Sequence, residues 1–347
     1  MDLNAAYRAC AQLTRREARN FYVAFLALPQ RQRLAVYALY AFCRNADDAV
    51  DAVDAADPCD PAGSHESLTG KSTEIGGSAL PDGRTESIAL DSRAAAVQPS
   101  GSARAAVGQT ETRDSTYWRR VALDRLRNRL AAAAEGRPED DPDLALADAI
   151  STYGVDPDDL GDVLTGMEMD LTLRRVATFE ELRTYCYHAA SAVGLATLPI
   201  LNDGVPPTDA MREAAIDLGL GMQLVNILRD VAEDLDRDRI YLPQDEIGAF
   251  GATEEDLAAA AGGAAPSDAL RAFLAFQADR AAETLAKGRR LVDLLPRRGG
   301  RCPALLAAVY GRILERIRAG GFEISRRASL PASEKLGLLL RSLAGRS

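Results

Sequence analysis

The stretch IDLGLGMQLVNILRDVAEDLDRDRIYLP, residues 216–243, decides the fold of this chain, because it reads as an apolar helix that carries a polar stripe. The stripe consists of amide and carboxylate side chains at intervals of three and four residues: Gln223, Asn226, Asp230 and Asp234. At that spacing the side chains share one face of an α-helix. Polar groups on an apolar helix are costly unless something binds them, and oxygen ligands of this kind suit Mg²⁺. The stretch therefore predicts a buried helix with a magnesium-binding face.

Positive charge accompanies the same stripe. Arg229 stands beside Asp230, and Arg237 and Arg239 follow it. Guanidinium groups bind phosphate oxygens through paired, charge-assisted hydrogen bonds. We therefore expect Arg229 and Arg239 to contact a diphosphate next to the metal.

A second acidic motif ends the segment LAVYALYAFCRNADDAVDA, residues 34–52. Its polar side chains recur at helical spacing: Tyr37, Tyr40, Arg44, Asp47 or Asp48, and Asp51. Asp47 and Asp51 are four residues apart, so they share a face and repel each other unless a cation is bound. Carboxylate oxygens are the ligands that Mg²⁺ prefers. This segment therefore predicts a second half of the same metal site.

Each motif alone is explained more simply as an amphipathic helix whose acidic end is solvated. Two such motifs, each with an arginine beside a pair of aspartates, favour acidic faces that meet inside an apolar helical bundle. The predicted ligands of Mg²⁺, for which Mn²⁺ can substitute, come from both motifs: Asp47, Asp51, Asn226, Asp230 and Asp234.

The rest of the chain predicts an all-α protein. Apolar residues return every three to four positions in long segments such as VALDRLRNRLAAAAEG, residues 121–136, and alternating strand patterns are absent. Residues 55–115 differ, since they contain no aromatic residue and are rich in Ala, Ser, Gly, Thr and Pro. Such a stretch buries too little apolar area to offset its ordering entropy. We predict one domain, residues 1–347, interrupted by a disordered insertion at 55–115.

Composition limits the function. The net charge of -10 argues against a nucleic-acid partner, which requires a basic face. The five cysteines are scattered and never form a CxxC pair, which favours a reducing cytoplasm over a disulfide framework. With only two histidines, His65 and His188, the chemistry must rest on carboxylates, amides, arginines and tyrosines.

At these motifs the sequence resembles the squalene/phytoene synthase family, and within it bacterial or archaeal phytoene synthases most. The resemblance covers nearly the whole chain apart from the insertion, and it rests on these segments: NFYVAFLALP (20–29), YALYAFCRNADDAVD (37–51), GMEMDL (166–171), YCYHAASAVG (185–194), LVNILRDVAEDLDRDRIYLP (224–243) and RRASLP (326–331). The family implies a single-domain helical bundle of the isoprenoid synthase type with a central active-site cavity. The combination of DxxxD, NxxRDxxxD and RIYLP is highly specific.

The resemblance also implies roles for individual residues. It adds Arg44, Arg229 and Arg327 as diphosphate-binding arginines, and Gln223 as a substrate contact. It places aromatic side chains in the substrate pocket: Phe21, Tyr40, Tyr241 and Tyr310. Tyr241 either orients the departing diphosphate or relays a proton, the alternative being a core tyrosine.

One stretch departs from the family pattern, which has small hydroxyl residues beside a basic residue just before Phe21. Here Ala18 has no polar side chain, whereas Arg19 keeps a charge and Asn20 keeps a hydrogen-bonding group. We expect Arg19 and Asn20 to bind substrate at this end.

The implied activity is the head-to-head condensation of two prenyl diphosphates through a cyclopropyl diphosphate. Two geranylgeranyl diphosphates would give phytoene, and a squalene-pathway enzyme using farnesyl diphosphate is the alternative. The nearest fragment of a dinucleotide-binding fingerprint, Gly219-Leu-Gly221, lies in a helix, which argues against NADPH. A head-to-tail chain elongator and a terpene cyclase are rivals, and the second acidic motif with its RIYLP end argues against them. A non-catalytic helical scaffold is a further rival, but it would be expected to lose at least one aspartate pair, and both pairs are present.

The substrate tails and the product are apolar, so the enzyme is expected to exchange them with a lipid bilayer. No apolar run is long enough to span a bilayer, but the C-terminal EKLGLLLRSLAGRS, residues 334–347, is basic and apolar on one side. It either lies on a membrane surface or docks on the bundle as a last helix. The oligomeric state is left open by the sequence.

Overall fold

The computed structural model of the protein describes the backbone of residues 1–51 and 101–343. Within these ranges the regular structure is helical, and the only bridge between extended residues is an isolated parallel one joining Arg175 and Ile240. The all-α prediction is therefore confirmed. The helices are α1 (Leu3–Glu17), α2 (Arg19–Phe25), α3 (Gln30–Asp51), α4 (Gly101–Ala134), α5 (Asp141–Tyr153), α6 (Pro157–Asp170), α7 (Phe179–Cys186), the π-helix η1 (Tyr187–Ser191), α8 (Ala192–Leu201), α9 (Asp209–Arg229), α10 (Val231–Asp236), α11 (Gln244–Ala249), α12 (Glu254–Ala261), α13 (Asp268–Gly288), α14 (Leu291–Leu294), α15 (Arg301–Ala319) and α16 (Ala332–Leu343).

The chain divides into two compact units. The first comprises Met1–Asp51 and Arg119–Ser347, and it contains the hydrophobic core and the candidate site; the second is Ala52–Trp118. Helix α4 begins at Gly101, within the predicted insertion, and residues 55–100 of that insertion lie outside the described residues. The disorder of the insertion and the single domain stay predictions.

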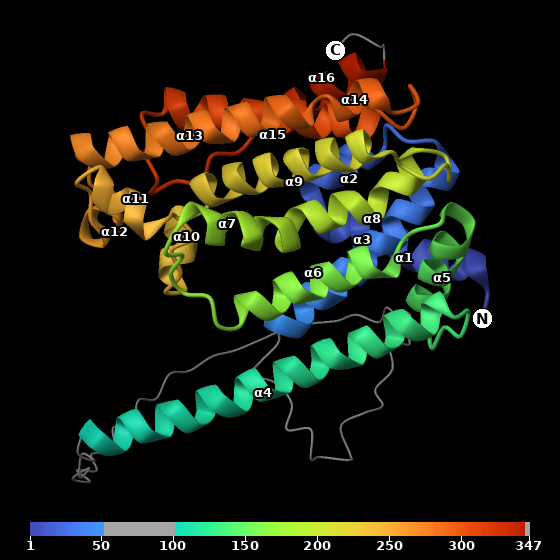
Figure 1. The fold of residues 1–347 in the computed structure, drawn as a ribbon, viewed down its shortest axis with the longest axis horizontal. Helices are drawn as coiled ribbons and strands as arrows, with labels where there is room; N and C mark the ends of the chain where they lie inside the picture. The colour runs from blue at the N-terminus through green and yellow to red at the C-terminus, as the bar shows by residue number, and fades with distance from the viewer. Residues whose placement is uncertain (52–100, 344–347) are drawn as a thin grey trace, which may run out of the picture. The chain divides into compact units, whose positions relative to one another are not determined.

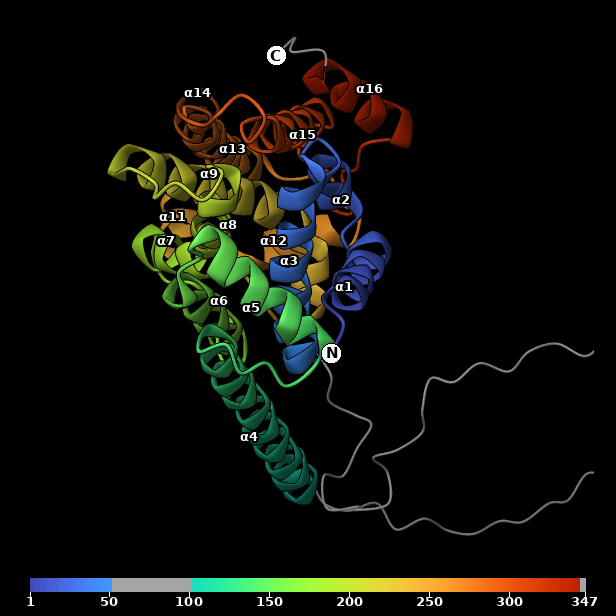
Figure 2. The ribbon, with the colours of Figure 1, turned by 90° about the vertical axis from the view of Figure 1, so that its right-hand side faces the viewer.

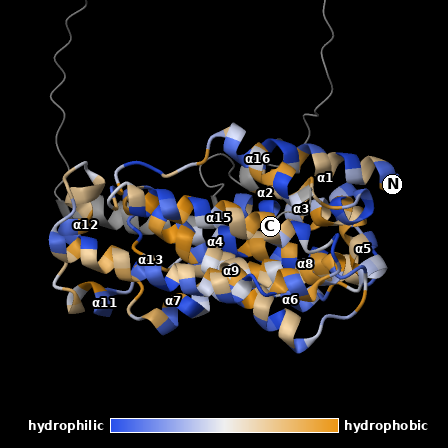
Figure 3. Ribbon diagram, turned by 90° about the horizontal axis from the view of Figure 1, so that it is seen from above, coloured by the Kyte–Doolittle hydropathy of each residue, from blue (hydrophilic) through white to orange (hydrophobic). Residues whose placement is uncertain are grey.

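The core of the first unit is built around α3, α8 and α9. Helix α9 packs against α13 on one side and against α8 on the other (Figure 1), while α3 contacts α1, α5, α6 and α8 (Figure 2). Helix α8 is apolar along nearly its whole length (Figure 3), as expected for a helix that is surrounded by other helices. Among the described residues, no helix is both long and apolar enough to cross a membrane.

The π-helix η1 packs closely against a helix on each side. The residues of η1 lie between α6 and α9, and each of these helices contributes a glycine at the contact. A Cβ atom on Gly166 would lie 2.9 Å from the carbonyl carbon of His188, and one on Gly219 would lie 2.6 Å from Cα of Ser191. Only glycine allows this approach. The wider turn directs Ala189 and Ala190 toward the cavity described below.

We expect Gly219→Ala to destabilise the protein by about 1–3 kcal/mol, because the added methyl group overpacks the contact with η1. Urea unfolding followed by circular dichroism measures the difference. Gly161→Ala in α6 is the matched control: apart from its own helix, no described residue has an atom within 4 Å of its Cβ position, so it should be neutral or stabilising by up to about 1 kcal/mol. Equal effects of the two substitutions would contradict the tight contact.

Candidate functional site

The first unit contains an apolar cavity of about 280 Å³, lined by residues of α2, α3, α6, η1, α8, α9, α14 and α15. Along α3 its lining runs from Val36 to Asp47, and along α9 from Ala215 to Asn226. Each stretch advances 11 residues, which corresponds to about 16 Å of helix. The lining is therefore long and apolar, which suits a hydrocarbon chain.

The two ends of the cavity differ chemically. Polar side chains gather at one end: Asp47, Gln223 and Asn226. The opposite end is apolar and lies where Leu201, Leu291 and Cys302 meet. A hydrogen bond of 2.9 Å from Gln32 Nε2 to the carbonyl oxygen of Ile200 joins the start of α3 to the end of α8. This bond holds the two helices together at the apolar end of the cavity.

The acidic motif of α3 reaches the polar end through Asp47. Asp48, in contrast, does not line the cavity, and it accepts a hydrogen bond of 2.5 Å from Arg44 Nη2, whereas the Arg44–Asp47 separation is 3.9 Å. The sequence left open whether Asp47 or Asp48 faces the site, and in the structure it is Asp47 that lines the cavity. The side chain of Asp51 lies outside the described residues, as do those of Arg19 and Asn20.

The motif of α9 is bent rather than continuous. Helix α9 ends at Arg229, Asp230 has a non-helical backbone (ψ 12°), and α10 begins at Val231. The bond from the Asp234 backbone N–H to the Asp230 carbonyl nevertheless continues the ladder at 2.9 Å. The polar residues therefore keep their helical spacing, and Asp230 lies at the bend between α9 and α10.

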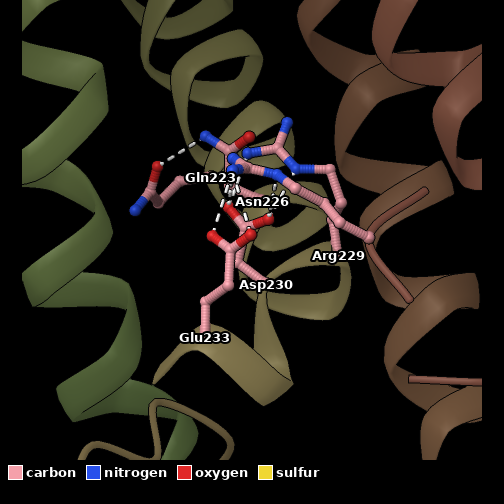
Figure 4. A network of polar contacts seen from close by, with 6 residues as sticks. Gln223, Asn226, Arg229, Asp230 and Glu233 are labelled. Atoms are coloured by element: carbon pink, nitrogen blue, oxygen red, sulfur yellow. Dashed lines mark hydrogen bonds and ion pairs between the residues drawn. The ribbon is translucent and has the colours of Figure 1, made fainter. Parts of the chain in front are cut away.

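Asp230 is the centre of a polar network at this bend (Figure 4). Arg229 donates to both of its carboxylate oxygens, from Nε at 2.7 Å and from Nη2 at 2.5 Å. Arg327, which lies 97 positions later in the sequence, approaches Asp230 at 3.0 Å and also donates to Glu233 at 3.0 Å. Asn226, which lines the cavity, donates to Gln223 Oε1 at 3.1 Å, and its backbone carbonyl oxygen accepts from the Asp230 backbone N–H at 2.9 Å.

A second cluster surrounds Asp170, at the end of α6. The Tyr241 hydroxyl donates to Asp170 Oδ1 at 2.8 Å, and Arg239 Nη2 donates to the Asp170 carbonyl oxygen at 3.0 Å. Tyr185 stacks on Tyr241 with ring centroids 4.8 Å apart. Burial, followed by the negative charge of Asp170, raises the pKa of Tyr241, so this phenol keeps its proton at neutral pH.

Asp234 lies within reach of both clusters. Burial raises its pKa to about 7, and the negative charges of Asp230 and Asp170 contribute in the same direction, opposed by Arg239 and Arg237. A carboxylate whose charge is disfavoured by burial and by two neighbouring carboxylates forms a place where a divalent cation relieves repulsion.

A prediction about stability follows from this pKa. The folded protein binds a proton at Asp234 up to about pH 7, whereas the unfolded chain releases it near pH 4. Stability contributed by this group is therefore full at low pH and is lost as the pH rises toward 7. In EDTA, the free energy of unfolding should fall between pH 5 and pH 8 more in the wild type than in Asp234→Asn, as measured by urea titration. Equal slopes would contradict the raised pKa.

Donor atoms without partners indicate where a ligand fits. Within the described part of the chain, three buried polar atoms of predicted site residues lack a hydrogen bond: Arg44 Nε, Asn226 Oδ1 and Arg239 Nε. An unpaired amide oxygen suits a metal, and unpaired guanidinium nitrogens suit an anion. Among the described residues, no three His, Cys, Asp or Glu side chains are already gathered as a metal site, and Asp51 is outside that set. The oxygen atoms present fit a divalent cation such as Mg²⁺, and the guanidinium groups beside them fit an anion.

The structure brings most of the predicted residues together. Phe21, Tyr40 and Gln223 line the cavity, and the Tyr310 ring lies 6.4 Å from that of Phe21. Tyr310 is buried, and burial raises its pKa, while contacts with Arg229 and Asn226 act in the opposite direction. Burial likewise raises the pKa of Tyr40 to about 12. Tyr241, Arg239, Arg229 and Arg327 lie outside the cavity lining, in the clusters beside its polar end.

Three residues contact the predicted site residues although the sequence pattern does not predict them as part of the site: Asp170, Tyr185 and Glu233. Asp170 stands in the segment GMEMDL, which carries part of the family resemblance, so a signal was present. Its role depends on contact with Tyr241, which lies 71 positions away, and no local spacing predicts that contact.

Comparisons with known proteins identify the family of the chain. The squalene/phytoene synthase family matches residues 14–70 and 89–334. The 15-cis-phytoene synthase of Synechococcus elongatus is 32% identical over 96% of this chain and 91% of its own length. That of Synechocystis sp. is also 32% identical, over 96% of this chain and 83% of its own.

Solved structures agree on the fold. A dehydrosqualene synthase in complex with a ligand superimposes with a TM-score of 0.74 at 24% identity, covering 99% of this chain and 97% of the other. A squalene synthase from Alicyclobacillus acidocaldarius superimposes with a TM-score of 0.69 at 25% identity, covering 92% and 96%. The predicted fold type and family are confirmed. The chain belongs to the squalene/phytoene synthase family and is a prenyltransferase.

Proposed function

We propose that the protein condenses two molecules of geranylgeranyl diphosphate head to head (1′-1) to phytoene. The observation that carries the proposal is that Asp47 of one acidic motif and Asn226 of the other line the same end of one apolar cavity. The similarity to 15-cis-phytoene synthases over nearly the full chain supports this product. We also infer one synthase domain working in the cytoplasm, and the interruption of the family match between residues 70 and 89 supports an insertion there.

The metal in this proposal is Mg²⁺, with Mn²⁺ as a substitute. Its ligands would come from both motifs: Asp47, Asp51, Asn226, Asp230 and Asp234. Bound there, the metal would supply positive charge that stabilises the departing diphosphate. The unpaired Asn226 Oδ1 and the crowded carboxylate of Asp234 support this assignment.

Arginines would hold the two diphosphates. Arg229 and Arg327 already converge on Asp230 from different segments, and Arg44 and Arg239 each keep an unpaired buried Nε. Arg19 and Asn20 would act at the α2 end. Tyr241 would orient the leaving group by turning its one hydroxyl proton, which it donates to Asp170 in this structure, toward the diphosphate.

The apolar cavity would protect the carbocations. Ionisation at C1 of the first substrate gives an allylic cation. The double bond of the second substrate attacks it and loses a proton, which gives the cyclopropyl diphosphate. Loss of the second diphosphate, rearrangement and a final proton loss give phytoene without a reductant. Phe21, Tyr40 and the alanines of η1 would exclude water from these steps.

A squalene-pathway enzyme that uses farnesyl diphosphate is the second candidate, supported by the fold of the solved dehydrosqualene and squalene synthases. Incubation with C15 and C20 diphosphates, each with and without NADPH, separates the two candidates. We expect a C40 hydrocarbon from the C20 substrate and no dependence on NADPH. A C30 hydrocarbon alone, or a product formed only with NADPH, would contradict the proposal.

A further inference from the structure

The segment KGRRLVDLLPRRGGR, residues 287–301, is strongly basic within an acidic chain. It carries six basic residues and one acidic residue, a net charge of +5, whereas the whole chain has a net charge of -10. Arg297 and Arg298 are exposed, and within the described residues neither of them takes part in an ion pair. Unpaired positive charge concentrated on one segment indicates an anionic partner.

Exposed leucines lie at the same end of the first unit. Leu294 of α14 is 39% exposed, and Leu336 and Leu340 of α16 are 54% and 58% exposed. The last two are four residues apart and share a face of α16, while the buried Leu339 faces the protein. A hydrogen bond of 3.3 Å from Ser342 Oγ to the Arg301 carbonyl oxygen ties the end of α16 to the start of α15. Figure 2 shows α14 and α16 flanking α15 at this end.

This basic and apolar surface covers the apolar end of the cavity. Leu291, inside the basic segment, lines the cavity, and so do Cys302 and Pro303, which directly follow it. The carbonyl oxygen of Leu201, another lining residue, would lie 1.8 Å from a Cβ on Gly299, so the segment is pressed onto the cavity wall. A single short stretch of chain thus separates the hydrocarbon site from the surface.

We propose that this docking surface, formed by Arg297, Arg298, Leu294, Leu336 and Leu340, binds an anionic phospholipid bilayer and places the apolar end of the cavity against it. The inference rests on the proposed function, because a C40 hydrocarbon has to leave for an apolar phase. Arginines meet the headgroup phosphates while leucines enter the acyl boundary. A protein partner would satisfy the leucines, but it would not explain why the surface abuts the hydrocarbon end of the cavity.

Sedimentation with vesicles tests the proposal. The full chain should partition onto vesicles of phosphatidylcholine containing 30% phosphatidylglycerol, and the partition coefficient should fall as salt rises. Arg297→Gln with Arg298→Gln should lower it by about 30-fold, since each arginine at an anionic surface contributes a factor of about five. Leu336→Ser with Leu340→Ser should lower it by roughly tenfold or more, because two apolar side chains no longer insert.

Controls separate docking from folding and from catalysis. Arg125→Gln with Arg183→Gln removes two exposed arginines elsewhere, from α4 and α7, and should leave vesicle binding within about twofold. In detergent micelles, where docking is not needed, the docking variants should keep wild-type turnover. If the wild type forms a C40 hydrocarbon in micelles but does not bind the vesicles, the docking surface is wrong while the proposed function stands. The docking surface would also be wrong if the wild type bound neutral and anionic vesicles equally well, or if both docking variants bound as well as the wild type.

Discussion

Asp230→Asn should lower kcat by about 10³-fold, because the loss of several kcal/mol of charge stabilisation at a metal-assisted site corresponds to that factor. Asp230 accepts hydrogen bonds from Arg229 and Arg327, so it organises both the predicted metal and the predicted diphosphate contacts. Asparagine keeps the shape and removes the charge. Single-turnover assays with C20 diphosphate and titrated Mg²⁺ measure the effect, and the Mg²⁺ concentration for half-maximal rate should rise.

The substitution also tests stability, since Arg229 is only 9% exposed and depends on Asp230 as its partner. Weakening this bond should lower the free energy of unfolding by about 1–3 kcal/mol. Asp236→Asn is the matched control, because Asp236 is exposed at the end of α10; it should leave turnover within about twofold. Unchanged turnover in Asp230→Asn would refute the metal assignment.

Asp47→Asn and Asp48→Asn should differ sharply although the residues are adjacent. Asp47 lines the polar end of the cavity, whereas Asp48 pairs with Arg44 and does not line it. We expect the Asp47 variant to lose about 100-fold or more in kcat, as for removal of one group that stabilises transition-state charge. The Asp48 variant should lose less than about fivefold, through the freed Arg44 alone.

Both side chains are substantially exposed, 44% for Asp47 and 51% for Asp48, so neither substitution should unfold the protein. Thermal unfolding within about 2 °C of the wild type checks this. A larger loss in the Asp48 variant, or equal losses, would mean that the cavity does not select between the two aspartates.

The sequence by itself determined the helical architecture and predicted the composition of the candidate site. The stripe of Gln223, Asn226, Asp230 and Asp234 has the period of a helix, and a periodic pattern of side chains is local information. The motif around Asp47 follows the same rule, and together they identified the family that the comparisons then confirmed. Residue types of restricted chemistry, carboxylate, amide and guanidinium, also limited what the site binds.

Only the tertiary structure decided which of these side chains meet. Asp47 rather than Asp48 faces the cavity because packing fixes the rotation of α3, and local spacing allows either. The contacts of Arg327 with Asp230 and of Tyr241 with Asp170 join segments 97 and 71 positions apart, and such contacts arise from chain folding. The same holds for the far end of the cavity. The basic segment 287–301 is predicted from the sequence only as surface charge, and the close packing of Gly299 on Leu201 places it over the apolar end of the cavity.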